Sequence, residues 1–288
     1  MKTPLIDRAV LRLSGEEVNP FLQGLISQDI EKLTPINALY ALLLTPQGKL
    51  LYDFFLVETT QGILVETAAE FVEPFLKRLK LYKLRAKIDI EPMPDWGVGV
   101  IYGNLPEAEP GRIMGLGTTD AIGFVDPRLA QLGLRVLAPK DELTAALNVI
   151  EATSGSPEDY QGWRYNHGVL EGGTDFAAES LFPLDANLDI LNGIDYKKGC
   201  FVGQEVSSRM KRKGVVKKRL WQVKSMQDLP ETGSFLKIDD KTIGTLVARS
   251  GKLGLAIVRP DRFGGTTPVQ VVADGQELHL CLPSYLET

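Results

Sequence analysis

The alternation of apolar and polar positions predicts short strands in the first third of the chain. Two apolar runs, residues 39–45 and 50–57, flank Thr45-Pro46-Gln47-Gly48, where the proline and glycine positions favour a type I turn. We therefore expect a β-hairpin there. Alternation predicts four more strands, at residues 5–13, 63–66, 87–90 and 96–102.

Helical spacing of apolar residues and helix-start signals predict several helices. Ser14 is a candidate N-cap for a helix to residue 25, and Ser156 followed by Pro157 predicts a helix over 156–168. Three more helices are expected at residues 73–82, 141–151 and 203–211. Residues 104–123, rich in Gly, Pro and Thr, read as loop with at most one short strand.

After Arg219 the pattern changes to short strands separated by Gly and Asp turns. Asp239-Asp240 and Asp274-Gly275 are typical of hairpin turns. Six strands are expected, at residues 220–223, 235–238, 242–248, 254–258, 269–272 and 278–282. The pattern therefore predicts an α+β region, residues 1–213, followed by a small all-β domain, residues 214–288.

Composition narrows the class of protein. The chain has 288 residues, 44% hydrophobic and 24% charged, as in globular proteins, and no apolar run approaches the length of a membrane span. Residues 1–4 show no signal or transit pattern, so a cytoplasmic location is expected. Two cysteines and two histidines without a CxxC predict neither a disulfide framework nor a metal or cluster site from this chain alone.

Charge is distributed unevenly. Residues 197–219 contain nine Lys or Arg and one acid, a balance of 9 − 1 = +8, which leaves −13 for the rest of a chain with net charge −5. Such a segment suits a polyglutamate tail, RNA or an acidic protein face; the alternative is a solvated linker. The acidic remainder argues against stable nucleic-acid binding.

One stretch concentrates chemistry around a cysteine, with the sequence Lys197-Lys198-Gly199-Cys200-Phe201-Val202-Gly203-Gln204-Glu205. Cys200 is expected at or just before a helix N-terminus, where free N–H groups, the macrodipole and the lysines favour a thiolate. Gly199 and Gly203 would admit a close backbone or ligand, or a positive φ. The alternative is a cysteine packed as a small hydrophobe.

These residues resemble the signature of the YgfZ family, namely Lys198, Gly199, Cys200, Phe201, Gly203, Gln204 and Glu205. Its members are folate-binding proteins that support assembly or repair of iron–sulfur proteins, and they include a mitochondrial factor for 4Fe–4S cluster maturation. Further similar segments lie at residues 21–24, 47–53, 160–169, 185–188 and 192–194. These are shared more loosely with the T-protein (aminomethyltransferase) of the glycine cleavage system.

The resemblance implies a T-protein-like fold, in which interleaved α/β lobes and a C-terminal small β-barrel close a ring around a folate channel. It implies a folate-binding accessory protein for 4Fe–4S proteins, with tRNA-modifying enzymes among its clients. The alternative is a tetrahydrofolate-dependent aminomethyl or one-carbon transferase, so whether the chain is an enzyme stays open. A thiol redox enzyme is a weaker option, because such an enzyme usually uses a resolving cysteine and Cys281 is too distant in sequence to be assigned that role. The expected partners are folate and iron–sulfur assembly or cluster-containing proteins, with no membrane, and the chain is expected to be a monomer.

The resemblance also assigns roles to single residues. It places the carboxylate of Asp53 near the folate reactive centre; the alternative is an Asp making local backbone bonds in the hairpin. Arg85 and Arg164 would pair with folate carboxylates or with structural acids. Gln204 is a further candidate folate ligand, and Cys200, Lys198 and Asp53 are the candidate catalytic residues.

Asn166 departs from the T-protein pattern. It stands where T-proteins carry a glutamate that holds the pterin ring through two acceptor oxygens, and an amide offers only one acceptor. That difference puts aminomethyl transfer in doubt. Cys281 is interpreted as structural, His167 as packed or hydrogen-bonded, and His279 as a surface residue.

Overall fold

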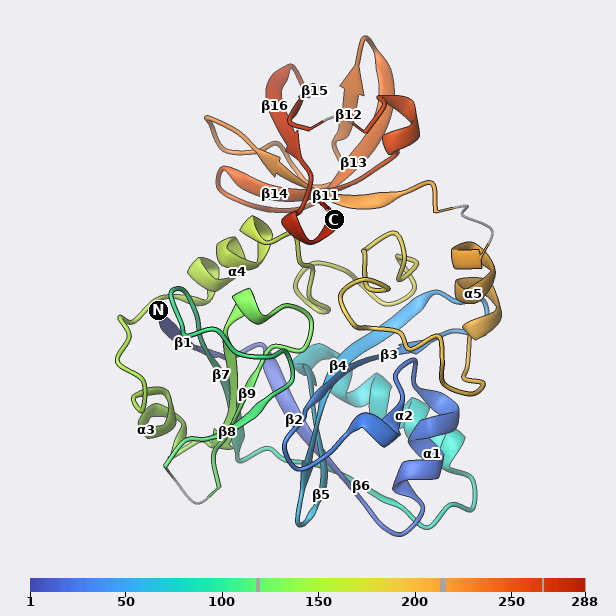
Figure 1. Cartoon of the computed structure of the whole chain (residues 1–288), viewed down its shortest axis with the longest axis vertical. Coiled ribbons are helices and arrows are strands. Elements are labelled where there is room, and N and C mark those ends of the chain that lie inside the picture. The colour runs from blue at the N-terminus through green and yellow to red at the C-terminus, as the bar shows by residue number, and fades with distance from the viewer. Residues whose placement is uncertain (118–119, 213–215, 266, 288) are drawn as a thin grey trace.

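The chain folds into two α/β lobes with a β-barrel above them, as the computed structural model shows (Figure 1). The structure describes residues 1–117, 120–212, 216–265 and 267–287. Strand β1 (Lys2–Leu5) pairs with β7 (Trp96–Ile101) of the second lobe, although all strands between them form the first lobe. The lobes are therefore interleaved, which confirms the predicted fold class.

The first lobe is a five-stranded sheet in the order β3-β4-β5-β2-β6. Its strands are β2 (Arg8–Ser14), β3 (Leu39–Leu44), β4 (Leu50–Thr59), β5 (Gly62–Ala68) and β6 (Asp89–Pro92). Helices α1 (Val18–Leu25) and α2 (Val72–Lys83) pack on one face. Alternate residues of β3 belong to two different cores, so this sheet is buried on both faces. Asp53 is on the β4 face that carries Phe55, toward the second lobe.

The second lobe has the strand order β1-β7-β10-β9-β8. It contains β8 (Ile113–Gly115), β9 (Ile122–Val125), β10 (Leu134–Pro139) and the short helix α3 (Leu143–Leu147). Helix α4 (Pro157–Asn166) lies between this lobe and the barrel (Figure 1). Its capping box, in which Ser156 and Asp159 bond each other's backbone N–H, confirms the predicted helix start.

The barrel closes in the order β11-β14-β13-β12-β15-β16. The strands are β11 (Arg219–Lys224), β12 (Phe235–Ile238), β13 (Lys241–Ser250), β14 (Leu253–Val258), β15 (Val269–Ala273) and β16 (Gln276–Cys281). Both turn residues are left-handed in Asp239-Asp240 and in Asp274-Gly275, so these hairpin turns are confirmed. The boundary predicted between residues 213 and 214 lies outside the described residues.

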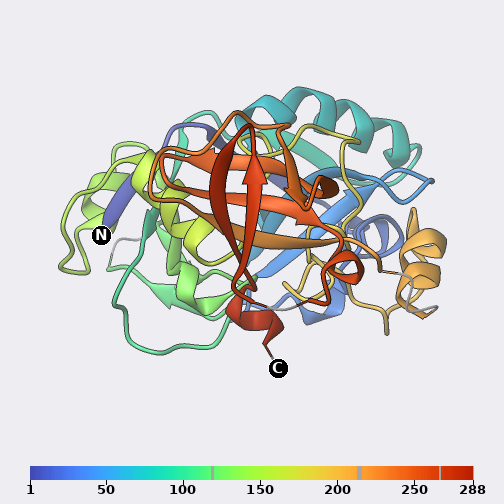
Figure 2. The same ribbon diagram turned by 90° about the horizontal axis from the view of Figure 1, so that it is seen from above.

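Helix α5 (Gln204–Arg212) lies at the edge of the molecule, outside the outline of the barrel (Figure 2). Within the described ranges, the remaining regular segments are 3₁₀ turns at Ile30–Lys32, Ala69–Phe71, Ala130–Leu132, Pro260–Arg262 and Ser284–Leu286.

Several predicted boundaries were wrong. Residues 5–13 form parts of two strands in different lobes, because a turn at Ile6-Asp7 separates them. Ser14 is a strand residue, and Glu17 precedes α1 without a side-chain cap. Helix α3 covers only five residues, and strand β10 was missed.

Candidate functional site

Cys200 is exposed on the loop that leads into α5. The helix begins at Gln204, so Cys200 lies four residues before its first helical residue. The sequence placed the thiol closer to the helix N-terminus than the structure does. The exposed position argues against the interpretation of Cys200 as a packed hydrophobe.

Lys198 anchors this loop to the first lobe. Its buried ammonium group donates hydrogen bonds to the carbonyl oxygens of Ile26 at 2.7 Å and Gln28 at 2.8 Å. Burial lowers the pKa of Lys198 to about 8, although Asp29 and Asp195 oppose that shift. Lys198 therefore holds the loop in place, and its hydrogen bonds are directed at carbonyl groups instead of the thiol.

Further hydrogen bonds join the same two segments. The hydroxyl of Ser27 donates to the carbonyl oxygen of Gly193 at 2.5 Å, and the Gln28 amide donates to that of Asn192 at 2.7 Å. The backbone N–H of Asp195 donates to the carbonyl of Ser27 at 3.0 Å. The chain leading to Cys200 is thus fixed by side-chain and backbone contacts.

Gly203 shows why a glycine is needed just before α5. Its φ is +80°, and an added Cβ would collide with the carbonyl oxygen of Thr45 in the β3–β4 turn. This close approach and positive φ were predicted. At Gly199, by contrast, a Cβ would meet open space and φ is not positive, so the close backbone and positive φ are wrong for Gly199, while its approach to a ligand stays a prediction.

A cavity of about 520 Å³ opens along α5, beside Tyr196 of the loop that precedes the helix. It is lined by Tyr196, Gln204, Glu205, Ser208, Lys211 and Arg212. The Lys211 ammonium lies 3.9 Å from the centre of the Tyr196 ring. Gln204, a predicted folate ligand, lines this cavity.

Asp53 is fully buried in the middle of β4. Its Oδ2 accepts hydrogen bonds from the Tyr40 hydroxyl at 3.1 Å and the Gly172 N–H at 3.3 Å, whereas Oδ1 has no partner among the described residues. Burial raises the pKa of Asp53, although Arg8 opposes the shift. The Tyr40 bond is made by a side chain of the paired strand β3, and Gly172 is 119 positions away, so the alternative of local backbone bonds in the hairpin was wrong.

Asp53 adjoins a set of buried ion pairs that we call the buried charge cluster. Its members are Arg8, Glu66, Asp126, Arg128, Arg135, Arg164, Glu171 and Asp175. Glu66 bridges Arg8 at 2.5 Å and Arg135 at 2.7 Å, while Glu171 lies 2.9 Å from both Arg128 and Arg135. Burial alone would raise the pKa of Glu171, but these guanidinium groups hold it well below the usual value. The cluster ties both lobes and α4 together.

The predicted folate ligands are not brought together. The guanidinium of Arg164 is buried against Asp175 at 2.5 Å and also donates to the carbonyl of Val169, so the structural-acid alternative holds for Arg164. Asn166 is exposed at the end of α4, and Arg85 is exposed after α2. Asp53 and Arg164 thus belong to the buried interior, whereas Asn166 and Arg85 do not.

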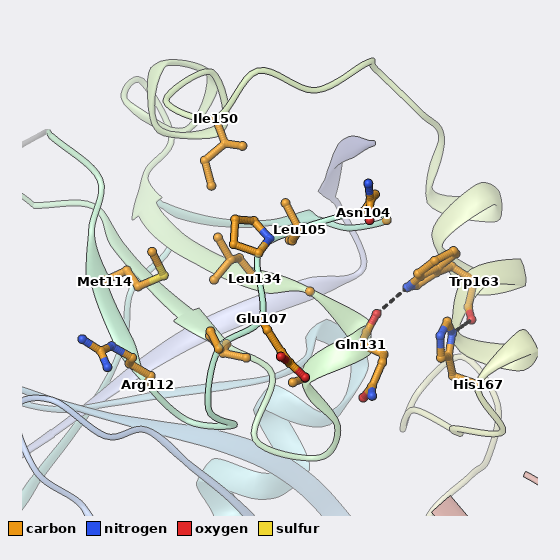
Figure 3. A pocket seen from close by; sticks show the side chains of 16 residues that line it. Asn104, Leu105, Glu107, Arg112, Met114, Gln131, Leu134, Ile150, Trp163 and His167 are labelled. Carbon is orange, nitrogen blue, oxygen red and sulfur yellow. Dashed lines mark hydrogen bonds between the residues drawn. The ribbon is translucent and has the colours of Figure 1, made fainter. Parts of the chain in front are cut away.

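A second cavity, of about 630 Å³, opens beside α4 (Figure 3). Apolar side chains of Leu105, Met114, Leu134 and Ile150 form much of its wall, and neither Asp53, Arg164 nor Asn166 lines it. His167 reaches the Trp163 carbonyl through Nδ1 at 2.8 Å, so it is hydrogen-bonded as predicted. His279 is exposed, as expected.

No group of three or more His, Cys, Asp or Glu side chains among the described residues could hold a metal ion. None of their helices is both long and apolar enough to cross a membrane.

The fold and sequence were compared with known proteins. The glycine cleavage system aminomethyltransferase T from Bartonella henselae matches with a TM-score of 0.76 over 98% of this chain and 84% of that protein, at 14% identity. Residues 217–288 match the family model described as CAF17, C-terminal beta-barrel domain. The chain therefore has the aminomethyltransferase fold, with a barrel of the CAF17 type.

Sequence relatives narrow the class further. The human mitochondrial iron-sulfur cluster assembly factor IBA57 is 32% identical, over 93% of this chain and 80% of that protein. The mouse protein of the same name is also 32% identical, over 92% and 81%. The chain belongs to the family of the iron-sulfur cluster assembly factor IBA57.

The same comparison overturns one prediction. Both relatives, and a 31% identical protein of Coccidioides immitis (strain RS), are named mitochondrial. The cytoplasmic location expected from the sequence is therefore contradicted.

Proposed function

We propose that this chain is an accessory factor in the assembly or repair of iron–sulfur proteins and that Cys200 is the group that acts there. The observation that carries the proposal is an exposed thiol on a loop whose neighbour Lys198 is buried and anchored. A thiolate is a soft ligand for iron and a nucleophile. The names of the relatives support this class of function.

The partners in this proposal are iron–sulfur assembly proteins or cluster-containing enzymes, 4Fe–4S proteins and tRNA-modifying enzymes among them, as in the YgfZ family. Protein-bound clusters are usually held by four ligands. Because Cys200 is a single exposed thiol, the remaining ligands would come from the partner. The chain would act as a monomer and offer one thiol to one partner.

Tetrahydrofolate binding is a second part of the proposal. The shared fold supports it, and the unpartnered buried Oδ1 of Asp53 is an acceptor that a folate N–H would satisfy. Asp53 would hold the ligand, whereas Arg164 is occupied by Asp175. A Cβ at Gly172 would collide with this same Oδ1, so the backbone at Gly172 covers the carboxylate and would have to move.

The alternative, a tetrahydrofolate-dependent transferase, is weaker because Asn166 is exposed and Arg164 is neutralised. Deleting the gene separates the two functions. An assembly factor predicts that activities of 4Fe–4S enzymes fall while glycine cleavage stays normal. Loss of glycine cleavage with normal cluster enzymes would instead establish the transferase.

Titration calorimetry tests the folate site directly. We expect heat on titration of the chain with tetrahydrofolate and its polyglutamates, and loss of that heat in Asp53→Asn. Asn166→Gln serves as the matched control, because the exposed Asn166 contributes nothing to the buried carboxylate and its replacement should leave the heat unchanged. No heat with the parent chain would refute folate binding.

A further inference from the structure

Four exposed cations on the segment that carries Cys200 form no ion pair in the part of the chain that the structure describes. Lys197, Arg209, Lys211 and Arg212 are exposed, and none forms an ion pair with a described residue. Lys211 contacts the Tyr196 ring, and Arg212 donates to a backbone carbonyl at 3.4 Å. We call these four residues the basic surface.

Two other cations of the same basic segment have partners, whereas Lys217 and Lys218 are exposed and form no ion pair with a described residue. Arg219 pairs with Asp189 at 2.6 Å. Lys198 is buried against carbonyl oxygens. Exposed cations without an ion pair among the described residues therefore gather along residues 197–218, and four of them lie on α5 and the loop before it, the segment that carries the exposed Cys200.

The basic surface and the thiol form one fixed unit. Tyr196 of the loop lines the same cavity as Lys211 and Arg212 of α5. Gly203 holds the start of the helix against the β3–β4 turn, since its backbone closely approaches Thr45. Figure 1 shows α5 at the outer edge of the first lobe. A partner can approach this edge without contacting the buried charge cluster.

We propose that the basic surface docks an acidic face of a partner protein and so brings that face to Cys200. The inference rests on the proposed function and names the chemistry of the partner. Arginine and lysine bind carboxylates directly, and Gln204 and Ser208 add uncharged hydrogen-bonding groups in the same cavity. RNA carries the same sign of charge, but the −13 outside residues 197–219 repels an extended polyanion.

The test measures thiol–disulfide exchange at Cys200 in a Cys281→Ser chain, where Cys200 is the sole thiol. The probes are a cysteinyl-hexaglutamate and a cysteinyl-hexalysine peptide, each as a mixed disulfide with thionitrobenzoate. Cys200 attacks the peptide sulfur, the protein–peptide disulfide forms, and coloured thionitrobenzoate leaves with the electron pair. At low salt we expect the hexaglutamate probe to react at least about tenfold faster. At about 1 M salt, where the Debye length is about 3 Å, the preference should largely vanish.

Variants assign the preference to the basic surface. Replacing Arg209, Lys211 and Arg212 together with Gln should reduce the preference to below about twofold. The uncharged reagent dithiodipyridine should react at the parental rate, which shows that the loop is intact. The matched control replaces Lys237, Lys241 and Lys252, three exposed barrel lysines, with Gln, and should keep the full preference.

Equal rates for the two peptides in the parent chain would overturn the proposal. So would loss of the preference in the barrel control, or stronger competition by oligouridylate than by hexaglutamate at physiological salt, which would assign the surface to RNA. The assay uses purified chain, so its failure is separate from that of the proposed function, which is measured as cluster-enzyme activity in cells.

Discussion

The charged side chains of the buried charge cluster are buried and paired, whereas those of the basic surface are exposed and form no ion pair with a described residue. In the cluster, each guanidinium group lies against a carboxylate, as Arg135 lies against Glu66 and Glu171. On the basic surface, Arg209 and Lys211 have no carboxylate partner among the described residues. Buried ions must be paired because desolvation is costly, whereas exposed ions need no partner. The paired charges hold the two lobes and α4 together, whereas the exposed cations on the Cys200 segment are available to a partner, as we propose.

The largest expected effect concerns the cluster. Glu171→Gln leaves the buried guanidinium groups of Arg128 and Arg135 without their shared carboxylate, so the free energy of unfolding should fall by about 3–5 kcal/mol. Urea unfolding measures it. Glu205→Gln, at an exposed position, is the matched control and should change it by less than about 0.5 kcal/mol. Similar losses in both variants would remove the distinction between the two regions.

A smaller effect is expected at the start of α5. Gly203→Ala places a Cβ against the Thr45 carbonyl at positive φ, so it should destabilise the chain by about 1–3 kcal/mol. Gly199→Ala, where a Cβ meets open space, should be neutral. Thermal unfolding of both variants gives the comparison, and equal midpoints would show that Gly203 is not needed for docking the loop.

Lys198 gives a pH-dependent test of the anchored loop. Its pKa falls from 10.5 to about 8 on folding, so the folded chain releases this proton before the unfolded chain does. Its contribution to the free energy of unfolding should therefore rise as the pH increases from about 8 to about 10.5. Lys198→Met should lose that rise, and the exposed-site control Lys197→Met should keep it. Identical pH profiles for the two variants would mean that the pKa of Lys198 does not fall on folding.

Asp53 should show the smallest effect, again through pH. Because burial raises its pKa above 3.8, the folded chain binds this proton more tightly than the unfolded chain. The Asp53 contribution to stability is therefore lost as the pH rises from 3.8 through the raised pKa. The free energy of unfolding of the parent minus that of Asp53→Asn should decrease over this window. An increase of this difference with pH would contradict a buried Asp53 carboxyl group whose pKa is raised by folding.

Local signals in the sequence predicted much of the fold. Thr45-Pro46-Gln47-Gly48 marked the hairpin that positions Asp53, and Ser156 marked the start of α4. These features depend on neighbours in sequence, so local chemistry is enough. Strand β10 was missed because its apolar run, Leu134–Pro139, is short and is interrupted by the charged Arg135.

The site was harder to predict because its contacts join residues that lie far apart in the sequence. Lys198 bonds to carbonyls 172 and 170 positions away, and no periodicity reports such acceptors. Arg8 and Glu66 meet across 58 positions. The available signal was a charged residue inside an apolar strand, as at Glu66 and Arg135, and it marks an ion pair without identifying the partner. The signature around Cys200 could be recognised from the sequence because its residues are contiguous.

The most direct test of the central claim compares the two cysteines in cells that lack the chain. Parent, Cys200→Ser and Cys281→Ser are expressed at matched protein levels, and aconitase and other 4Fe–4S enzyme activities are measured. Cys281 is half-buried in β16, and burial raises its pKa, so it should be dispensable. The account predicts that Cys281→Ser restores these activities and Cys200→Ser, although folded, does not. Full restoration by Cys200→Ser would contradict it.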